Sequence, residues 1–172
     1  MALILLRHTR PDVLTGTCYG ARDVGLAATF AGEAEALLPG LPSFSRVVTS
    51  PLSRCRRLAE YIGARASCPL TEDDRLREMN FGSWEGRSWN EIPFTEIDIW
   101  VNDFLHARPH GGESVAMLRA RTFEALDAYR KLGGDTLIVT HAGVIKAALA
   151  TDETADSHAM TLDFGNFVTL ID

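Results

Sequence analysis

Short apolar runs bounded by polar residues alternate with longer stretches of helical character along this chain. The runs predict strands at Ala2–Leu6, Arg46–Thr49, Asp135–Thr140 and Asn166–Ile171. Runs of this length with few polar residues are typical of buried parallel strands, and we expect the last one at an edge of the sheet. The alternation indicates layers of helices on a mostly parallel sheet, which is the α/β class.

Residue spacing and end signals predict three helices, at Leu26–Leu38, Pro51–Ala64 and Ser114–Leu132. Ser50 is expected to cap the second helix, with Pro51 at its first position. Gly133 and Gly134 end the third helix. The segment from Glu72 to Gly112 holds all three tryptophans and is expected to be an insertion over the sheet. Since the sequence shows no repeat or linker, we expect one domain over residues 1–172.

Basic and imidazole side chains follow three of the predicted strands. Arg7 and His8 follow the first strand, Arg54 opens the helix after the second, and His141 follows the third. Parallel strands end at one edge of a sheet, and open α/β sheets bind ligands outside that edge. Each residue alone is more often structural, but their common position predicts a binding site.

The binding site expected at this edge of the sheet suits a phosphoryl group. The guanidinium groups of Arg7 and Arg54 match phosphate oxygens in a bidentate manner, and the helix start near Pro51 adds N–H donors. A neutral imidazole held against the phosphate can attack phosphorus through a ring nitrogen, while the surrounding cations stabilise the transferring charge. Alternatively, Arg54 belongs to an exposed basic helix face together with Arg56 and Arg57.

The alkoxide released in such a reaction needs a proton donor, and Glu78 is the candidate. It lies among apolar and turn residues, so partial burial would favour its protonated form. Alternatively, Glu78 only pairs with Arg75 or Arg77. Trp84 is expected to anchor the insertion, although it lies close enough to Glu78 in sequence to line a pocket. The acidic run 72–74 is interpreted as a solvated turn.

Three further histidines are assigned no part in the chemistry. His106 and His110 have the spacing of a metal pair, but Pro109 interrupts the helix that would align them, so a loop is expected. His158 has no evident partner in the sequence. The sequence therefore predicts no metal site.

Four segments carry a shared signature in a fixed order: Arg7-His8, Ser50–Arg54, Glu78–Gly86 and His141–Gly143. They resemble the histidine phosphatase superfamily, which includes the cofactor-dependent phosphoglycerate mutases and the α-ribazole phosphatases. The resemblance implies a phosphoglycerate mutase-like, three-layer α/β/α fold with a mostly parallel central sheet. It implies that His8 is phosphorylated during turnover, and that no metal or cofactor is needed. It also implies that Arg7, Arg54 and His141 form a phosphate pocket and that Glu78 is the proton donor.

The chain looks most like the α-ribazole phosphatase branch, through its short length, Cys18–Asp23, and Glu78–Gly86 followed by Trp89. That branch acts on the 5′-phosphate of a nucleoside of the cobalamin lower ligand. A broad-specificity small-molecule or sugar phosphatase and a mutase-like phosphotransferase stay open as alternatives. Thr9 stands where the family usually has glycine. Substrate contacts are expected from Arg7, Thr9, Tyr19, Gly20, Arg54, Phe81, Trp84, His141 and Ala142.

Two other classes of protein compete with this interpretation. The stretch Gly112–Ala116 approximates the nucleophile elbow of a serine hydrolase, with Asp135 and His141 following in a suitable order. That motif must follow a strand, and no apolar run precedes it, so Ser114 is expected to be a helix cap. A phospholigand-binding protein without turnover would share the fold. Nucleotide triphosphate motifs of the GxxxxGK[ST] and GxGxxG types are absent.

Composition narrows the expected partners. With 172 residues, 46% of them hydrophobic, the chain can bury a core, and its net charge is −6. Because no basic stripe is present, we expect no nucleic acid as a partner, only a small phosphomonoester. Three cysteines without a CxxC pair indicate the reducing cytoplasm, and no apolar run is long enough for a membrane span. A monomer and a homodimer both stay open.

Overall fold

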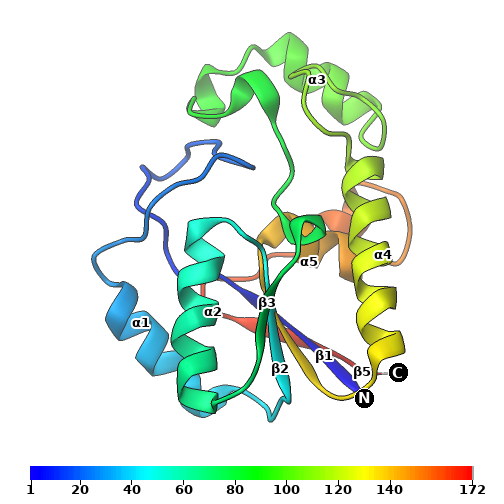
Figure 1. Cartoon of the computed structure of the whole chain (residues 1–172). Coiled ribbons are helices and arrows are strands. Elements are labelled where there is room, and N and C mark those ends of the chain that lie inside the picture. The colour runs from blue at the N-terminus through cyan, green and yellow to red at the C-terminus, as the bar shows by residue number, and fades with distance from the viewer. Residues whose placement is uncertain (172) are drawn as a thin grey trace.

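A five-stranded sheet in the order β3-β2-β4-β1-β5 forms the centre of the computed structural model, which describes residues 1–171 (Figure 1). The strands are β1 (Ala2–Arg7), β2 (Arg46–Thr49), β3 (Leu70–Glu72), β4 (Thr136–Thr140) and β5 (Phe167–Ile171). The helices are α1 (Phe30–Leu37), α2 (Ser53–Ala66), α3 (Phe94–Asn102), α4 (Val115–Leu132) and α5 (Ala142–Leu149). Only β5 runs antiparallel to its neighbour, so the expected edge strand and mostly parallel sheet are confirmed.

Helices cover both faces of the sheet. Alternate strand residues point to opposite faces. Ile4 and Leu6 of β1 therefore pack in a core with α1 and α2, while Leu3 and Leu5 pack in a second core with α4 and α5. Figure 1 shows the two helix layers on either side of the strands. The three-layer α/β/α architecture is thus confirmed, and both layers are held by buried aliphatic side chains.

Two predicted helices begin later than expected. α1 starts at Phe30, not Leu26, because Leu26 forms an isolated bridge with Pro11 and holds the chain extended. α2 starts at Ser53, and its N-cap position is Leu52, which gives no side-chain cap. The expectation that Ser50 caps this helix is wrong.

α4 follows the prediction closely. The Ser114 side chain accepts a hydrogen bond from the Met117 N–H at 3.2 Å, so it is the N-cap. Gly133 ends the helix with φ of +68°, a conformation that favours glycine. The pattern did not predict β3, α3 and α5.

Most of the insertion extends beyond the carboxyl ends of the strands (Figure 1). Its first residues, among them Leu76 and Met79, pack into the core on the α4 face of the sheet. Its small core is built around Trp84, which has no exposed surface and packs with Cys18 and Ile92. The Trp84 Nε1–H donates to Glu96 at 2.6 Å, which fixes α3 to this core. The tryptophan therefore anchors the insertion and offers no surface to a ligand, so its expected substrate contact is wrong.

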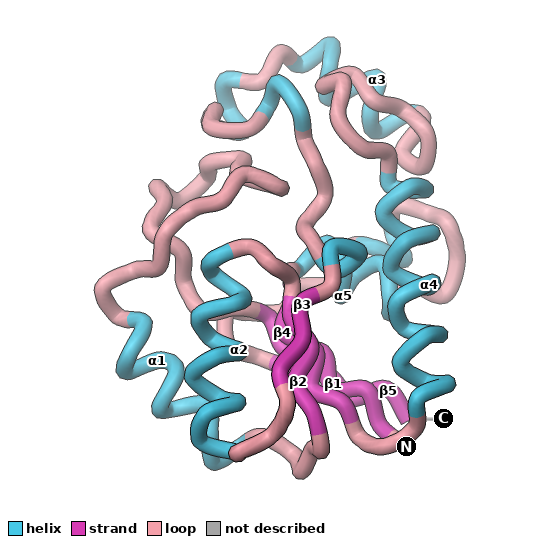
Figure 2. The backbone as a smooth tube through the Cα atoms, viewed as in Figure 1, coloured by secondary structure: helices cyan, strands magenta, loops and turns pink. Residues whose placement is uncertain are grey.

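The long loop of residues 8–29 reaches up to the insertion, as the pink tube in Figure 2 shows. There the Cys18 N–H donates to the Arg87 carbonyl at 2.9 Å, and the Gly86 N–H donates to the Cys18 carbonyl at 2.6 Å. These two bonds fix the position of the following residues, Tyr19–Arg22, above the start of α2.

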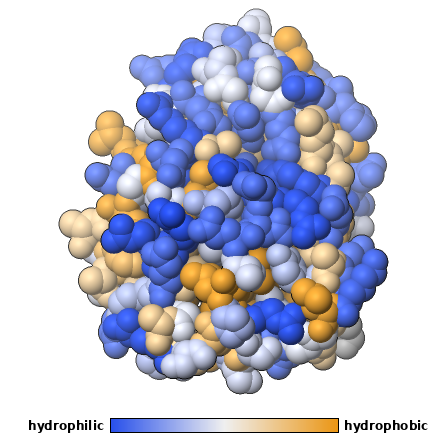
Figure 3. Space-filling model, viewed as in Figure 1, coloured by the Kyte–Doolittle hydropathy of each residue, from blue (hydrophilic) through white to orange (hydrophobic). Residues whose placement is uncertain are grey.

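The surface is mainly hydrophilic on the face that carries the edge strand β3, and the hydrophobic residues there form separate patches (Figure 3). Within residues 1–171, no helix combines the length and the hydropathy that crossing a membrane requires.

Candidate active site

The register of the sheet brings the two histidines together. Arg7 of β1 pairs with Thr140 of β4, so the next residues, His8 and His141, leave neighbouring strands at the same level. Their ring centroids lie 5.2 Å apart at an interplanar angle of 63°. β2 ends beside them, because Thr49 pairs with Val139. The imidazoles and the start of α2 thus share one edge of the sheet, as the spacing of the motifs implied.

His8 is held as a neutral imidazole with one free ring nitrogen. Its Nδ1 lies 2.7 Å from the Thr9 carbonyl oxygen, which can only accept, so Nδ1 carries the hydrogen and Nε2 the lone pair. Burial, the nearby Arg54 and then Arg7 lower the His8 pKa from 6.5 to about 3, against the raising effect of the Thr9 carbonyl. A neutral ring with a free lone pair has the protonation state of a nucleophile.

His141 is also fully buried and neutral. Its Nε2 lies 2.8 Å from the Ser50 hydroxyl and 3.4 Å from the Cys55 sulfur. Burial and the Arg54 charge lower its pKa well below the ordinary value. Burial likewise raises the pKa of the Cys55 thiol, so an uncharged thiol faces the ring. Ser50, which the sequence assigned to a helix cap, is instead the partner of His141.

Arg54 points inward from the first turn of α2. It is 0% exposed, whereas Arg57 on the same helix is exposed, so its alternative assignment to a basic surface is wrong. Its two terminal nitrogens donate to the carbonyls of Gly20 and Arg22 at 2.6 and 2.9 Å. The guanidinium carbon lies 5.0 Å from the centre of the Tyr19 ring. The loop after Cys18 thus cradles a buried positive charge.

Three buried donors at this edge lack a hydrogen-bond partner among the described residues: Arg7 Nε, Thr9 Oγ1 and Arg54 Nε. Arg7 donates through Nη1 to the Leu162 carbonyl at 2.5 Å and stacks 3.9 Å from the Phe164 ring centre. Buried polar groups without partners are costly and rare, and they often mark the place of a ligand. Two of the donors are cationic, so an anion matches them.

Glu78 lies against the start of α5. Its Oε2 accepts from the Gly143 N–H at 3.0 Å, and a Cβ added to Gly143 would collide with its Oε1. The glycine after His141-Ala142 therefore makes room for this carboxyl group. Arg75 and Arg77 pair with Asp73 and Asp74 instead, so the alternative pairing of Glu78 is wrong.

The main chain around Glu78 is clamped by α4. The Arg121 Nη1 donates to the carbonyls of Arg75 and Arg77, both at 2.6 Å, and its Nη2 donates to the Glu78 carbonyl at 3.2 Å. Glu113 holds the other side of the guanidinium at 2.7 Å. Sequence reasoning missed Arg121, because its spacing on α4 gives no signal of a main-chain partner so distant in sequence.

The four predicted substrate contacts outside the phosphate pocket and the tryptophan core form two groups. Tyr19 and Gly20 border Arg54, while Phe81 and Ala142 line a cavity that also contains Glu78. Gly20 permits close packing, since an added Cβ would lie 2.8 Å from the Phe81 ring. Both groups flank the segment that carries Glu78.

Aromatic side chains flank the buried residues of the site. His8, Thr9, Arg54 and His141 are each at most 1% exposed. Phe164 lies over Arg7 and 5.5 Å from the His8 ring, and Tyr19 covers the Arg54 side. Phe164 precedes β5 in a loop, and nothing in its sequence context predicted this position.

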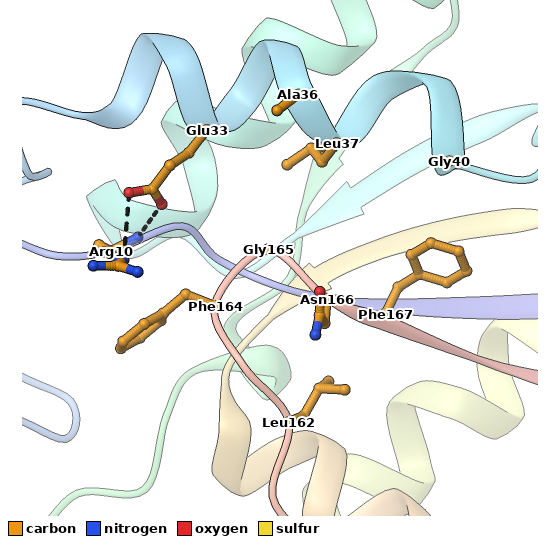
Figure 4. Close-up of a pocket in the computed structure, with 10 residues that line it drawn as sticks. All are labelled: Arg10, Glu33, Ala36, Leu37, Gly40, Leu162, Phe164, Gly165, Asn166 and Phe167. Carbon is orange, nitrogen blue, oxygen red and sulfur yellow. Dashed lines mark hydrogen bonds and ion pairs between the residues drawn. The ribbon is translucent and has the colours of Figure 1, made fainter.

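A separate cavity of about 550 Å³ lies on the outer side of Phe164, between α1 and the loop before β5 (Figure 4). The basic side chain in its wall, Arg10, faces Glu33. The Arg10 Nε lies 3.6 Å from one Glu33 carboxylate oxygen, and the Arg10 main-chain N–H donates to the other at 3.0 Å. The positive charge in this cavity is therefore already paired, unlike the donors beside His8.

His110 and His158 have structural contacts, and those of His158 correct the expectation from the sequence. His110 lies in a loop, packs 4.7 Å from Trp84, and accepts from the Gly112 N–H through Nδ1 at 2.9 Å. His158 does have partners, the Thr154 carbonyl at 2.7 Å and Arg119 at 2.9 Å. The acidic run is not a simple solvated turn either, since Asp73 accepts from Arg75 and Tyr129.

The serine hydrolase alternative does not fit the structure. Ser114 caps α4, and its Oγ is used there. Asp135 and His141 lie at opposite ends of β4, and Asp135 accepts from the Ala2 N–H at 2.8 Å. A strand of this length separates its ends by roughly 15 Å or more, so the three residues do not form a triad.

Comparison with known proteins places this arrangement in a family. The model of the histidine phosphatase superfamily (branch 1) matches residues 3–166. The chain is 33% identical over 113 residues to the probable phosphoglycerate mutase GpmB of Escherichia coli O1:K1, which covers 62% of this chain and 52% of that protein. It thus spans about half the length of this curated relative.

Two solved structures extend the likeness to nearly the whole chain. The α-ribazole phosphatase from Shigella flexneri has a TM-score of 0.83 and 27% identity, over 98% of this chain and 89% of that one. A phosphoglycerate mutase from Thermus thermophilus has a TM-score of 0.79 and 30% identity, over 99% of this chain and 92% of that one. The chain belongs to the histidine phosphatase superfamily, and its relatives are named as phosphatases and mutases.

The two buried neutral histidines predict a loss of stability in mild acid. An unfolded histidine binds a proton near pH 6.5, whereas folded His8 does so only near pH 3, so the unfolded chain holds more protons between these values. The free energy of unfolding should therefore fall as the pH drops below 6.5, by about 1.4 kcal/mol per pH unit for each such histidine. Urea unfolding at about pH 7.5, 6.5 and 5.5 measures how the free energy of unfolding changes with pH. His8→Asn should reduce this slope, and an unchanged slope would contradict the assignment.

Proposed function

We propose that this chain is a phosphomonoesterase that acts on a small-molecule phosphate ester through a phosphohistidine at His8. The observation that carries the proposal is the combination of a neutral His8 with a free Nε2 and buried cationic donors without partners around it. A phosphoryl group supplies the acceptors that these donors lack, and it brings phosphorus to the ring nitrogen. The continuous sheet supports a single domain.

The proposed reaction has two steps. In the first, His8 Nε2 forms a bond to phosphorus, the bond from phosphorus to the ester oxygen breaks, and Glu78 gives its proton to the leaving oxygen. In the second, the oxygen of a water molecule forms a bond to phosphorus while Glu78 takes a proton from that water. The bond between phosphorus and His8 Nε2 breaks, its electron pair returns to the ring nitrogen, and inorganic phosphate leaves. Arg7 and Arg54 stabilise the charge on the transferring group in both steps, with His141 beside it.

The relatives support two candidates for the natural substrate. The likeness to an α-ribazole phosphatase of similar length supports a nucleoside 5′-phosphate, and α-ribazole 5′-phosphate is our first candidate. The likeness to proteins named as phosphoglycerate mutases supports phosphotransfer between hydroxyl groups as the second. In both, the histidine chemistry is the same and only the acceptor of the phosphoryl group differs.

A turnover screen tests the proposal. We expect inorganic phosphate to be released from at least one of α-ribazole phosphate, sugar phosphates, phosphoglycerates and nucleoside monophosphates, and the rate to survive excess EDTA. Transfer to a second hydroxyl without phosphate release would favour the mutase. Activity that EDTA removes and zinc or magnesium restores would contradict the histidine mechanism, as would phosphate binding without turnover on every ester.

Gly143→Ala should impair the proton donor selectively. The new Cβ occupies the position of Glu78 Oε1, and because that atom ends a flexible side chain, the carboxyl group moves while the fold persists. We expect hydrolysis of alkyl phosphates to slow by about 10-fold to 100-fold, with much less effect on p-nitrophenyl phosphate. Gly40→Ala, at a position where an added Cβ meets nothing, is the control. Equal losses on both esters would show general damage to the site.

A further inference from the structure

A cavity of about 230 Å³ lies directly beside the proposed proton donor. Glu78 forms part of its wall, and so do Ala142 and Gly143, the residues that follow His141. The remaining wall is mainly apolar and comes from the insertion, α4, α5 and the segment before β5: Met79, Phe81, Trp100, Phe104, Val115, Leu118, Lys146 and His158.

The chemistry of the site determines what enters this space. The group that protonates a leaving oxygen must touch that oxygen, so the alcohol part of the ester begins where the Glu78 carboxyl group lies. The segment that carries Glu78 borders a second cavity on its opposite side, lined by Arg77, Arg108 and Arg121 together with acidic residues. These arginines are already paired with the acidic residues or with main-chain carbonyls. That second cavity, of about 500 Å³, is also lined by Glu78, but its wall is polar. The apolar cavity is therefore the side that suits a group without a charged partner.

The walls favour an aromatic or other apolar ring. Phe81, Trp100 and Phe104 provide ring faces and edges, with Phe104 5.7 Å from the Trp100 ring and 5.3 Å from His158. Both nitrogens of His158 are already bonded, so this side chain presents ring surface and not a free donor. An apolar cavity of about 150 Å³ is enough to hold benzene, so the volume here admits one ring with a short linker.

We propose that this cavity binds the alcohol part of the substrate, and that the preferred esters carry an apolar ring one to three bonds from the ester oxygen. The inference rests on the proposed phosphomonoesterase function and deepens it, because it names a substrate class. It ranks these esters above α-ribazole 5′-phosphate, in which a hydrophilic ribose separates the aromatic ring from the ester oxygen. Small hydrophilic esters, with nothing to bury in the cavity, are poorer substrates of the same reaction.

The test compares 2-phenylethyl phosphate with ethyl phosphate, whose leaving alcohols have similar acidity and differ in the ring. We expect kcat/KM for the phenylethyl ester to be at least about 10-fold higher. Phe104→Ala, at a half-buried position on the cavity wall, should reduce this ratio several-fold, and Phe104→Leu should reduce it less. Phe94→Ala removes the same ring from an exposed position on α3 and should leave the ratio unchanged.

The outcomes separate the two proposals. Hydrolysis of both esters with equal kcat/KM, in a reaction that His8→Asn abolishes, would overturn the cavity assignment and leave the phosphomonoesterase function intact. A preference for the phenylethyl ester that Phe104→Ala and Phe104→Leu leave unaltered would also overturn it, since the ring would then bind elsewhere. No hydrolysis of any ester in the wider screen would overturn both. Because the readout is a ratio of two substrates, partial unfolding of a variant does not affect it.

Discussion

Replacing His8 with asparagine is expected to lower kcat by at least about 10⁴-fold on every phosphate ester, because the variant lacks the free Nε2 lone pair that would attack phosphorus. His141, the second imidazole, is turned to Ser50 and Cys55 and does not replace it. Steady-state rates measure the loss. A rapid acid- and alkali-quench experiment with ³²P-labelled ester tests the intermediate, since a phosphohistidine is labile in acid and stable in alkali.

Asparagine keeps a polar group near the Thr9 carbonyl, so the variant should fold and still bind inorganic phosphate through the arginines. Binding of phosphate, measured by its stabilisation against thermal unfolding, is therefore the control. If the variant retained turnover, or if the labelled protein of the wild type were stable in acid and labile in alkali, His8 would not be the nucleophile.

The second large effect is expected from Glu78→Gln. Glutamine keeps the size of the side chain and removes the proton that the leaving alkoxide needs. Hydrolysis of alkyl phosphates should slow by about 10²-fold to 10⁴-fold, the usual contribution of general acid catalysis, whereas p-nitrophenyl phosphate should slow by less than about 10-fold. The reason is that p-nitrophenolate is a stable anion and leaves without a proton.

The ratio of the two losses is the decisive measurement, made as kcat/KM on the same enzyme preparation. Glu72→Gln, at an exposed carboxylate at the end of β3, is the matched control and should change neither rate. Equal losses on both esters would assign Glu78 to binding or folding, and not to proton transfer.

Much of this architecture was predictable from the chain, because the apolar runs are short, uninterrupted and bounded by polar residues. The runs at Ala2–Leu6 and Arg46–Thr49 became β1 and β2 within one residue at either end. The site was predictable for the same reason. In a parallel sheet, the residue after each strand has its place set by the strand register, so the motif positions of His8 and His141 already implied proximity.

What the sequence did not predict depends on contacts between distant segments. β3 has three residues, Leu70–Glu72, too few for a periodic signal. Serine is a common residue at helix N-caps, so the sequence suggested that role for Ser50. Its actual partner, His141, follows the neighbouring strand β4 and is identified by the fold. The same holds for Arg121, whose hydrogen bonds reach main-chain carbonyls more than 40 residues away. Side chains that bond to a distant backbone leave no local pattern.

The aromatic rings beside the two guanidinium groups have a consequence for the effect of salt. Phe164 lies over Arg7 and Tyr19 lies over Arg54, and Arg54 has no exposed surface. Buried charges are screened much less by dissolved ions than charges on the surface. The attraction of these two cations for an anion is therefore expected to persist at ionic strengths that suppress binding to exposed arginines.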